Sequence, residues 1–274
     1  MRTVNESLRQ YARGLAGGLL FSLPLLYTME VWWAGFTSHP WRLAAYVAAT
    51  FALLLGYNYF LGLRRDSCFS EVVIDSFEEM GLGLLTAFLV LWLLGRVNLD
   101  QPAAEIVGKT TIEAMTVAIG FSVGTSQLGA EGDGDKGVGG GEFEPSFAGQ
   151  LVIALCGAVL FAANVAPTEE IVMIAVEISA WRLAGLALLS LSLGALVLYY
   201  SEFAGSKRFV RFDAHHDVLV GTVVTYAVAL AASAAILGFF GRFDGQALAT
   251  CVAQTVVLGV ASTLGASAGR LLLQ

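Results

Sequence analysis

The chain has 274 residues, of which 57% are hydrophobic and only 14% are charged, and its mean hydropathy is +0.72. Soluble domains carry about a quarter charged residues, so this composition excludes an ordinary water-soluble protein. The net charge of −7 argues against nucleic acid as a partner, because proteins that bind nucleic acid present basic surfaces. The apolar runs 82–94 and 183–198 do not alternate, which favours membrane helices over barrel strands.

Eight apolar stretches follow one another and predict an all-α, polytopic membrane helix bundle. Each is long enough for the roughly 20 residues that a helix needs to cross a bilayer. The expected spans are 13–37, 41–63, 76–97, 103–127, 148–178, 181–201, 218–241 and 246–270. The first span is expected to be retained, because no small-residue cleavage site follows it.

Lysine and arginine residues are distributed unevenly between the two sides. Ten lie at the termini and in the even-numbered loops, and four lie in the opposite loops. The ten are Arg2, Arg9, Arg13, Arg64, Arg65, Lys136, Lys207, Arg208, Arg211 and Arg270, and the four are Arg42, Arg96, Arg182 and Arg242. The positive-inside rule then predicts that both termini are cytoplasmic.

A glycine-rich, acidic stretch at 129–145 separates two halves of the chain. Such a composition predicts a flexible linker, so we expect a repeat at 1–127, a linker at 128–147 and a second repeat at 148–274. Before the seventh span, His215 and His216 lie beside Asp213 and Asp217. This cluster is interpreted as a solvated loop, and a regulatory role for it or for the linker is left open.

The two halves align with each other at offsets that drift from 140 to 146 residues. Glu30 aligns with Glu170 at an offset of 140, and Gly95-Arg96 aligns with Gly241-Arg242 at an offset of 146. The segment 120–124 aligns with 265–269 at an offset of 145, and both read Gly-x-Ser-x-Gly. This self-similarity predicts a duplicated four-helix unit. Because four is an even number of spans, the repeats are expected to be parallel.

The two Gly-x-Ser-x-Gly segments do not predict a serine nucleophile, which needs a strand–turn–helix elbow. Inside membrane helices the same letters form Gly-x-x-x-Gly, which lets helix backbones approach closely. Such contacts fit packing within the chain or in a homo-oligomer. The sequence also lacks a repeated histidine cluster and an aspartate-rich diphosphate motif, so we expect neither an enzyme nor an organic cofactor.

Acidic residues inside the expected spans are the candidate functional groups, because carboxylates at membrane depth are costly and mark ion or proton pathways. Glu30 follows Pro24 in span 1, and Glu169 and Glu170 follow Pro167 in span 5. A proline frees a carbonyl one turn back, and broken membrane helices use such carbonyls to bind cations. We therefore predict Glu30, Glu169 and Glu170 as ligands of a cation.

Further oxygen-bearing side chains complete the predicted ion-binding or proton-relay set. Asn164 and Thr168 flank Pro167, and Glu177 lies on the same helical face as Glu170. Glu113 lies near the middle of span 4. Because Lys109 and Glu105 precede it at spacings of four and eight residues, an ion pair along the helix is an equal alternative to a functional role for Glu113.

One further acidic segment, at 71–79, alternates with Phe69, Val72 and Phe77. It predicts a short amphipathic helix at the inner surface that leads into span 3.

The motifs LPLLYTMEVWW (23–33) and NVAPTEEI (164–171), together with the glycine-rich linker, resemble an uncharacterised family of bacterial integral membrane proteins. The resemblance covers essentially the whole chain. It implies a multi-pass protein of the bacterial cytoplasmic membrane and implies no particular activity.

The favoured hypothesis is a transport protein, either a channel or a proton-coupled carrier, for a small cation. Spans 1 and 5 would then face each other, with Glu30 and Glu170 along the path. The alternative is a non-transporting membrane sensor or assembly subunit that binds a cytoplasmic partner. The ion, the direction, the coupling and the oligomeric state are left open by the sequence.

Overall fold

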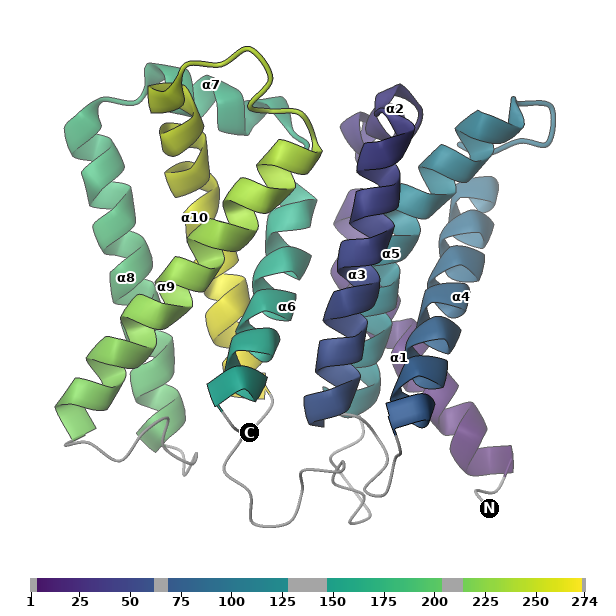
Figure 1. The fold of residues 1–274 in the computed structure, drawn as a ribbon, viewed down its shortest axis with the longest axis horizontal. Coiled ribbons are helices and arrows are strands. Elements are labelled where there is room, and N and C mark those ends of the chain that lie inside the picture. The colour runs from purple at the N-terminus through teal and green to yellow at the C-terminus, as the bar shows by residue number, and fades with distance from the viewer. Residues whose placement is uncertain (1–3, 62–68, 128–146, 204–213, 273–274) are drawn as a thin grey trace. The chain divides into compact units, whose positions relative to one another are not determined.

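The computed structural model describes residues 4–61, 69–127, 147–203 and 214–272, and all regular elements in these ranges are α-helices (Figure 1). The helices are α1 (Val4–Leu26), α2 (Met29–Thr37), α3 (Pro40–Leu61), α4 (Phe69–Leu93), α5 (Ala103–Gln127), α6 (Phe147–Val165), α7 (Glu169–Glu177), α8 (Ala180–Phe203), α9 (Ala214–Phe239) and α10 (Leu248–Leu272). Seven helices in the described ranges are long and apolar enough to cross a membrane, and the bent pair α1–α2 would be an eighth crossing. The predicted polytopic helical bundle is confirmed.

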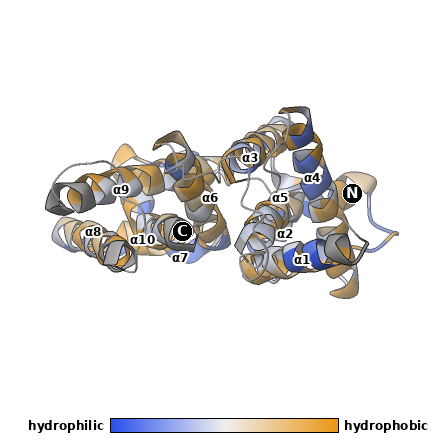
Figure 2. Ribbon diagram, turned by 90° about the horizontal axis from the view of Figure 1, so that it is seen from below, coloured by the Kyte–Doolittle hydropathy of each residue, from blue (hydrophilic) through white to orange (hydrophobic). Residues whose placement is uncertain are grey.

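The chain forms two compact units, Met1–Phe143 with α1–α5 and Glu144–Gln274 with α6–α10. In each unit the last helix is central: α5 packs against α1, α2, α3 and α4, and α10 packs against α6, α7, α8 and α9 (Figure 2). Within its most apolar stretch 83% of α5 is buried, against 44% of α10. The interior of the first unit, around α5, is therefore the most enclosed part of the described chain.

The expected spans at 13–37 and 148–178 are each interrupted near a proline, where the sequence indicated a helix break. In the first unit the chain breaks between Leu26 and Met29, and α2 is bent by 86° from α1. In the second unit α6 ends at Val165, and α7 begins only at Glu169.

Proline explains both breaks, because it lacks a backbone N–H and disfavours a continuous helix. Pro24 lies in the last turn of α1, and Pro167 lies in the gap before α7. The Thr28 hydroxyl donates to the Pro24 carbonyl at 2.8 Å, and the Thr168 hydroxyl donates to the Val165 carbonyl at 2.9 Å. The end of each unit that carries the break is called its break end below, and the opposite end is called its terminal end.

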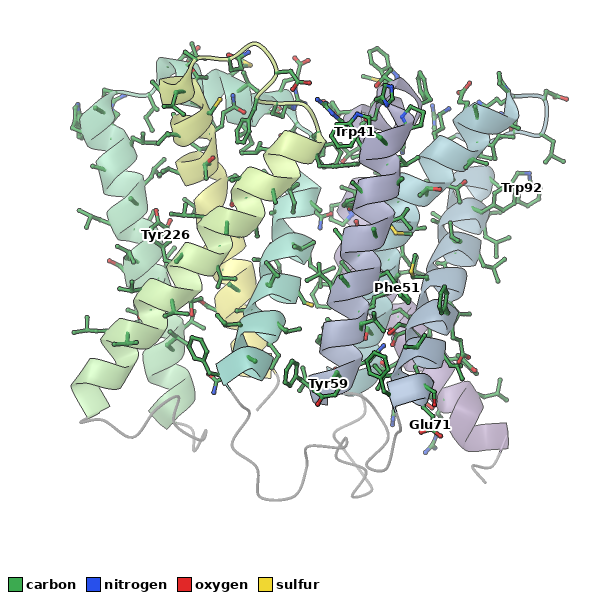
Figure 3. The ribbon with its side chains drawn as sticks, in the orientation of Figure 1. Trp41, Phe51, Tyr59, Glu71, Trp92 and Tyr226 are labelled. Atoms are coloured by element: carbon green, nitrogen blue, oxygen red, sulfur yellow. The ribbon has the colours of Figure 1, made fainter. Side chains whose placement is uncertain are left out.

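Exposed aromatic side chains lie near both ends of the first unit. Trp41 and Trp92 lie near the break end, and Tyr59 lies near the terminal end (Figure 3). Between them, large hydrophobic side chains are exposed on the outer faces of the helices, for example Leu85 and Leu89 of α4. Amphipathic rings at two levels with an apolar band between them are typical of a membrane helix bundle.

The Gly-x-Ser-x-Gly segments are helix contacts, as predicted. A Cβ atom added to Gly17 of α1 would lie 2.8 Å from the carbonyl oxygen of Gly120 on α5. A Cβ atom added to Gly157 of α6 would lie 2.9 Å from the carbonyl carbon of Gly265 on α10. The backbones touch at these points, so any side chain there would push the central helix away from its neighbour.

Candidate functional site

The acids predicted near the breaks lie on the two short helices. Glu30 is the second residue of α2 and is partly buried, whereas Glu169 and Glu170 open α7 and are exposed. Glu177 ends α7 and is also exposed. Glu169, Glu170 and Glu177 therefore lie beyond the end of α6 and not within a helix of membrane-spanning length.

A structural cause explains why Glu30 and Glu170 align. Thr28 and Thr168 are the N-cap residues of α2 and α7, and each acid lies in the first turn that follows. Carboxylates there interact favourably with the helix dipole, by about 0.3–1 kcal/mol. The matched acids thus mark matched helix starts. Their predicted role in cation binding stays a prediction.

An arginine near each break comes from the segment that follows a long helix, Arg96 after α4 and Arg242 after α9. In the second unit, Arg242 donates a hydrogen bond from Nη2 to the carbonyl oxygen of Pro167. In the first unit, the Arg96 guanidinium lies 4.9 Å from the centre of the Trp32 ring, and Trp32 Nε1 donates to the Leu26 carbonyl at 3.1 Å.

The uncharged groups predicted as ligands around Pro167 each make a hydrogen bond within the protein. Asn164 Nδ2 donates to the Leu160 carbonyl at 2.6 Å, and the Thr168 hydroxyl donates to the Val165 carbonyl. The Pro167 carbonyl accepts from the Arg242 guanidinium. Among the residues that the structure describes, no group of three or more His, Cys, Asp or Glu residues is arranged to hold a metal ion. The His215–His216 side chains, Asp213 and all of the linker except Phe147 lie outside the described residues.

Glu113 lies inside the first unit, on α5, and its side chain is completely buried. Both of its carboxyl oxygens are without a hydrogen-bond partner among the described residues, and so is the Thr110 hydroxyl one turn earlier. An unpaired polar group in an apolar interior costs several kcal/mol as a rule. Buried groups that stay unpaired in this way are candidates for a functional role.

The predicted ion pair along α5 forms between Lys109 and Glu105 and does not include Glu113. Lys109 Nζ lies 2.5 Å from Glu105 Oε1 and donates to the Arg96 carbonyl at 3.2 Å. The lysine therefore points toward the break end, away from Glu113. The structure leaves Glu113 outside the pair.

A second buried carboxyl group, that of Glu79 on α4, is only 6% exposed. It accepts a hydrogen bond from Asn58 Nδ2 of α3 at 2.8 Å, and the same amide donates to Ser76 Oγ at 3.1 Å. Asn58 Oδ1 accepts from Ser122 Oγ of α5 at 3.0 Å. Three helices thus meet at one polar cluster that contains a carboxyl group and no basic side chain among its described hydrogen-bond partners.

Hydroxyl groups extend this cluster along the interface of α3, α4 and α5. Tyr46 Oη lies 3.4 Å from Thr116 Oγ1, one turn from Glu113, and Tyr57 Oη lies 2.5 Å from Ser126 Oγ. At a rise of 1.5 Å per residue, Glu113 and Ser122 are about 14 Å apart along α5. We call this set the interior polar row; it consists of Tyr46, Tyr57, Asn58, Ser76, Glu79, Glu113, Thr116, Ser122 and Ser126.

The second unit lacks both carboxyl groups at the matching positions. At the offset of 145, Glu113 corresponds to Leu258, and at the offset of 146, Glu79 corresponds to Thr225. Both of these residues are buried. The acidic part of the interior is therefore a property of the first unit, and the two units are not chemically equivalent.

The sequence indicated Glu113 and missed Glu79. Glu79 follows Glu71, Asp75 and Glu78, and this run of acids is typical of a helix at the membrane surface. In the structure the run forms the first turns of α4, and Glu79 faces inward. The overlooked signal is the spacing of three and four residues in a stripe of small or polar side chains; the stripe consists of Val72, Ser76, Glu79, Gly83 and Thr86.

The chain belongs to a protein family, since the family model described as "Putative integral membrane protein (DUF2391)" matches residues 10–273. No curated protein and no solved structure matches the chain. The family description agrees with the apolar helices and adds nothing about a substrate.

Proposed function

We propose that this integral membrane protein transports protons, or a small cation coupled to protons, along the interior polar row of the first unit. The observation that carries the proposal is a pair of buried carboxyl groups, Glu113 and Glu79, at mid-length of two helices long enough to cross a membrane. Ionisable residues at membrane depth mark ion pathways and proton relays in membrane proteins.

The surroundings of the two acids support a relay. Hydroxyl and amide groups of Tyr46, Thr116, Ser122 and Asn58 lie along the interface between them. Such groups both donate and accept hydrogen bonds, so they can orient water molecules or pass protons. The nearest lysine on α5, Lys109, is engaged with Glu105 and therefore does not neutralise Glu113.

The test is proton and cation flux into liposomes that contain the purified full-length chain. Glu113→Gln and Glu79→Gln keep the size of each side chain and remove its titrating oxygen. Each is expected to lower flux about 100-fold or more, the scale of losing a proton-transfer group. Glu105→Gln, which changes an acid outside the interior polar row, is the matched control and should retain flux.

The acids at the breaks provide the competing location for the path. Glu30→Gln and Glu170→Gln in the same assay are expected to retain flux, because these carboxylates also serve as first-turn acids of α2 and α7. Loss of flux in these variants alone would move the path to the breaks. Absence of flux in the unaltered chain would favour the alternative of a sensor or assembly subunit.

We also propose that the two units arose by duplication and that both termini face the cytoplasm of a bacterial cell. Two features support duplication: α7 begins and ends 140 residues after α2, and α10 begins and ends 145 residues after α5. An equivalent hydrogen bond recurs between the last helix of each unit and the segment before it, since Lys109 donates to the Arg96 carbonyl and Gln254 donates to the Arg242 carbonyl at 3.3 Å. The excess of lysine and arginine on one side supports the orientation.

A further inference from the structure

The hydrogen atoms around Asn58 can be placed by counting donors and acceptors. Ser76 Oγ gives its single hydrogen to the Val72 carbonyl at 2.8 Å, so toward Asn58 it can only accept. The Asn58 amide nitrogen must therefore face Ser76, and its second hydrogen goes to Glu79 Oε2. Asn58 Oδ1 is then left as the acceptor for the Ser122 hydroxyl.

The Ser122 hydroxyl has no hydrogen left for Glu79, because its only hydrogen goes to Asn58 Oδ1. The Glu79 carboxyl group, which is 6% exposed, is therefore bound by one neutral donor, Asn58 Nδ2, and by no basic side chain among its described hydrogen-bond partners. Burial of a charge without a cationic partner is costly, so this arrangement favours a carboxyl group that carries a proton.

We infer that Glu79 is a proton-binding site in the polar cluster that it forms with Asn58 and Ser122, and that Asn58 is its positioning residue. Its consequence for transport rests on the proposed function: the ion that passes Glu79 along the interior polar row is a proton and not a metal ion. A bound metal ion needs oxygen lone pairs around it, whereas Asn58 presents N–H donors and its one oxygen is taken.

Release of the proton leaves a charged group in this cluster. The O–H bond of Glu79 breaks, and the proton moves to water at the terminal end. The carboxylate that remains has the Asn58 amide as its donor and no basic side chain among its described hydrogen-bond partners, so rebinding of a proton is favoured. The other titratable groups nearby are Asp75 and Glu78 on the same helix, Tyr57 on α3, which is bonded to Ser126, and Tyr11 on α1, which is bonded to Glu78.

The test is infrared spectroscopy of the full chain in lipid at neutral pH, which detects the carbonyl stretch of a protonated carboxyl group. Glu79→Gln should remove one such band, and Glu113→Gln identifies any band from the second acid. Asn58→Leu should shift the Glu79 band to higher wavenumber, because the carboxyl group loses its hydrogen bond from the amide. Ser122→Ala should cause a smaller shift, because Ser122 acts on Glu79 only by orienting Asn58. Thr225→Val, at the matching position of α9, should leave the band unchanged.

Two results would overturn the inference. One is a spectrum in which Glu79→Gln removes a carboxylate band and no protonated band. The other is a Glu79 carboxylate band that responds to exchange of sodium or potassium for choline, which would indicate a metal ion. Both readouts are independent of flux, so a chain with the protonated band and no flux would retain the proton site and lose the transport proposal.

Discussion

Glu113 offers the clearest separation of stability from function at the level of one residue. The matching residue of the second unit is Leu258, so leucine is compatible with this position of a central helix. Glu113→Leu should raise the stability of the full chain by about 1–3 kcal/mol, because it removes a buried carboxyl group that has no described hydrogen-bond partner. The unfolding midpoint in detergent measures this change, while flux should be lost.

The control at the residue scale is Glu105→Leu. It removes the partner of Lys109, a residue that is only 8% exposed, and leaves a largely buried ammonium group without its carboxylate. The expected change in stability has the opposite sign. Equal effects of the two leucine variants would contradict the assignment of Lys109 to Glu105 alone.

Two residues, Lys109 and Glu79, show which features of the candidate site could be predicted from sequence patterns. The spacing along α5 predicted that Lys109 could pair with either Glu105 or Glu113. In the structure Lys109 pairs with Glu105, because its ammonium group also donates to the Arg96 carbonyl at the break end. Glu79 could not be separated from its acidic neighbours, because its burial depends on Asn58 and Ser122 from two other helices. A site formed by side chains of three helices cannot be predicted from the residue pattern of a single helix.

At the scale of elements, the glycine contacts predict that Gly→Ala substitutions lower stability at some positions and raise it at others. Gly17→Ala and Gly157→Ala place a Cβ against the backbone of a central helix and should cost about 1–3 kcal/mol. Gly81→Ala and Gly185→Ala meet nothing within 4 Å and should stabilise by about 0.5–1 kcal/mol, because alanine favours a helix. Unfolding of the full chain in detergent measures all four. A loss of stability at Gly81 or Gly185 would contradict the packing described here.

Loss of the arginine near each break is expected to increase local unfolding of α7 more than local unfolding of α2. Arg242→Met removes a charged hydrogen bond to the Pro167 carbonyl, worth about 1.5–3 kcal/mol, so α7 amides should exchange hydrogen roughly ten- to hundredfold faster. Arg96→Met should have a smaller effect on α2, because Trp32 still holds the Leu26 carbonyl. Hydrogen exchange read by mass spectrometry compares the two, and equal effects would contradict this assignment.

The breaks also show that the sequence indicates where a helix is interrupted but not how sharply the chain then bends. Hydropathy runs through Tyr27–Met29 and through Ala166–Thr168 without a polar gap long enough to signal an end. Pro24 and Pro167 indicated the place, but the angle of 86° between α1 and α2 depends on how α2 packs against α5. Gly35 of α2 and Gly108 of α5 make that contact, since a Cβ on Gly35 would lie 2.8 Å from the Gly108 carbonyl oxygen.

At the scale of the whole molecule, each unit contributes four long helices and one short one, so both termini and the linker should lie on one side of the membrane. Single cysteines introduced at residues 2, 136 and 273 of a cysteine-free chain should all react with a membrane-impermeant thiol reagent from the cytoplasmic side. Protection of one of the three sites would contradict the topology. The fold class was predictable at this scale, because it follows from the composition and from the hydropathy along the chain.

The position of α5 and α10 has a consequence for biogenesis. Each is the helix on which its unit packs, and each is the last of its unit to be synthesised. Three long helices and one short helix of each unit are therefore synthesised before their common partner, and in the first unit Asn58 and Glu79 then lack the contact of Asn58 with Ser122. The membrane insertion machinery has to shelter these polar faces until the fifth helix arrives, and stalling synthesis before Ala103 should expose them to degradation.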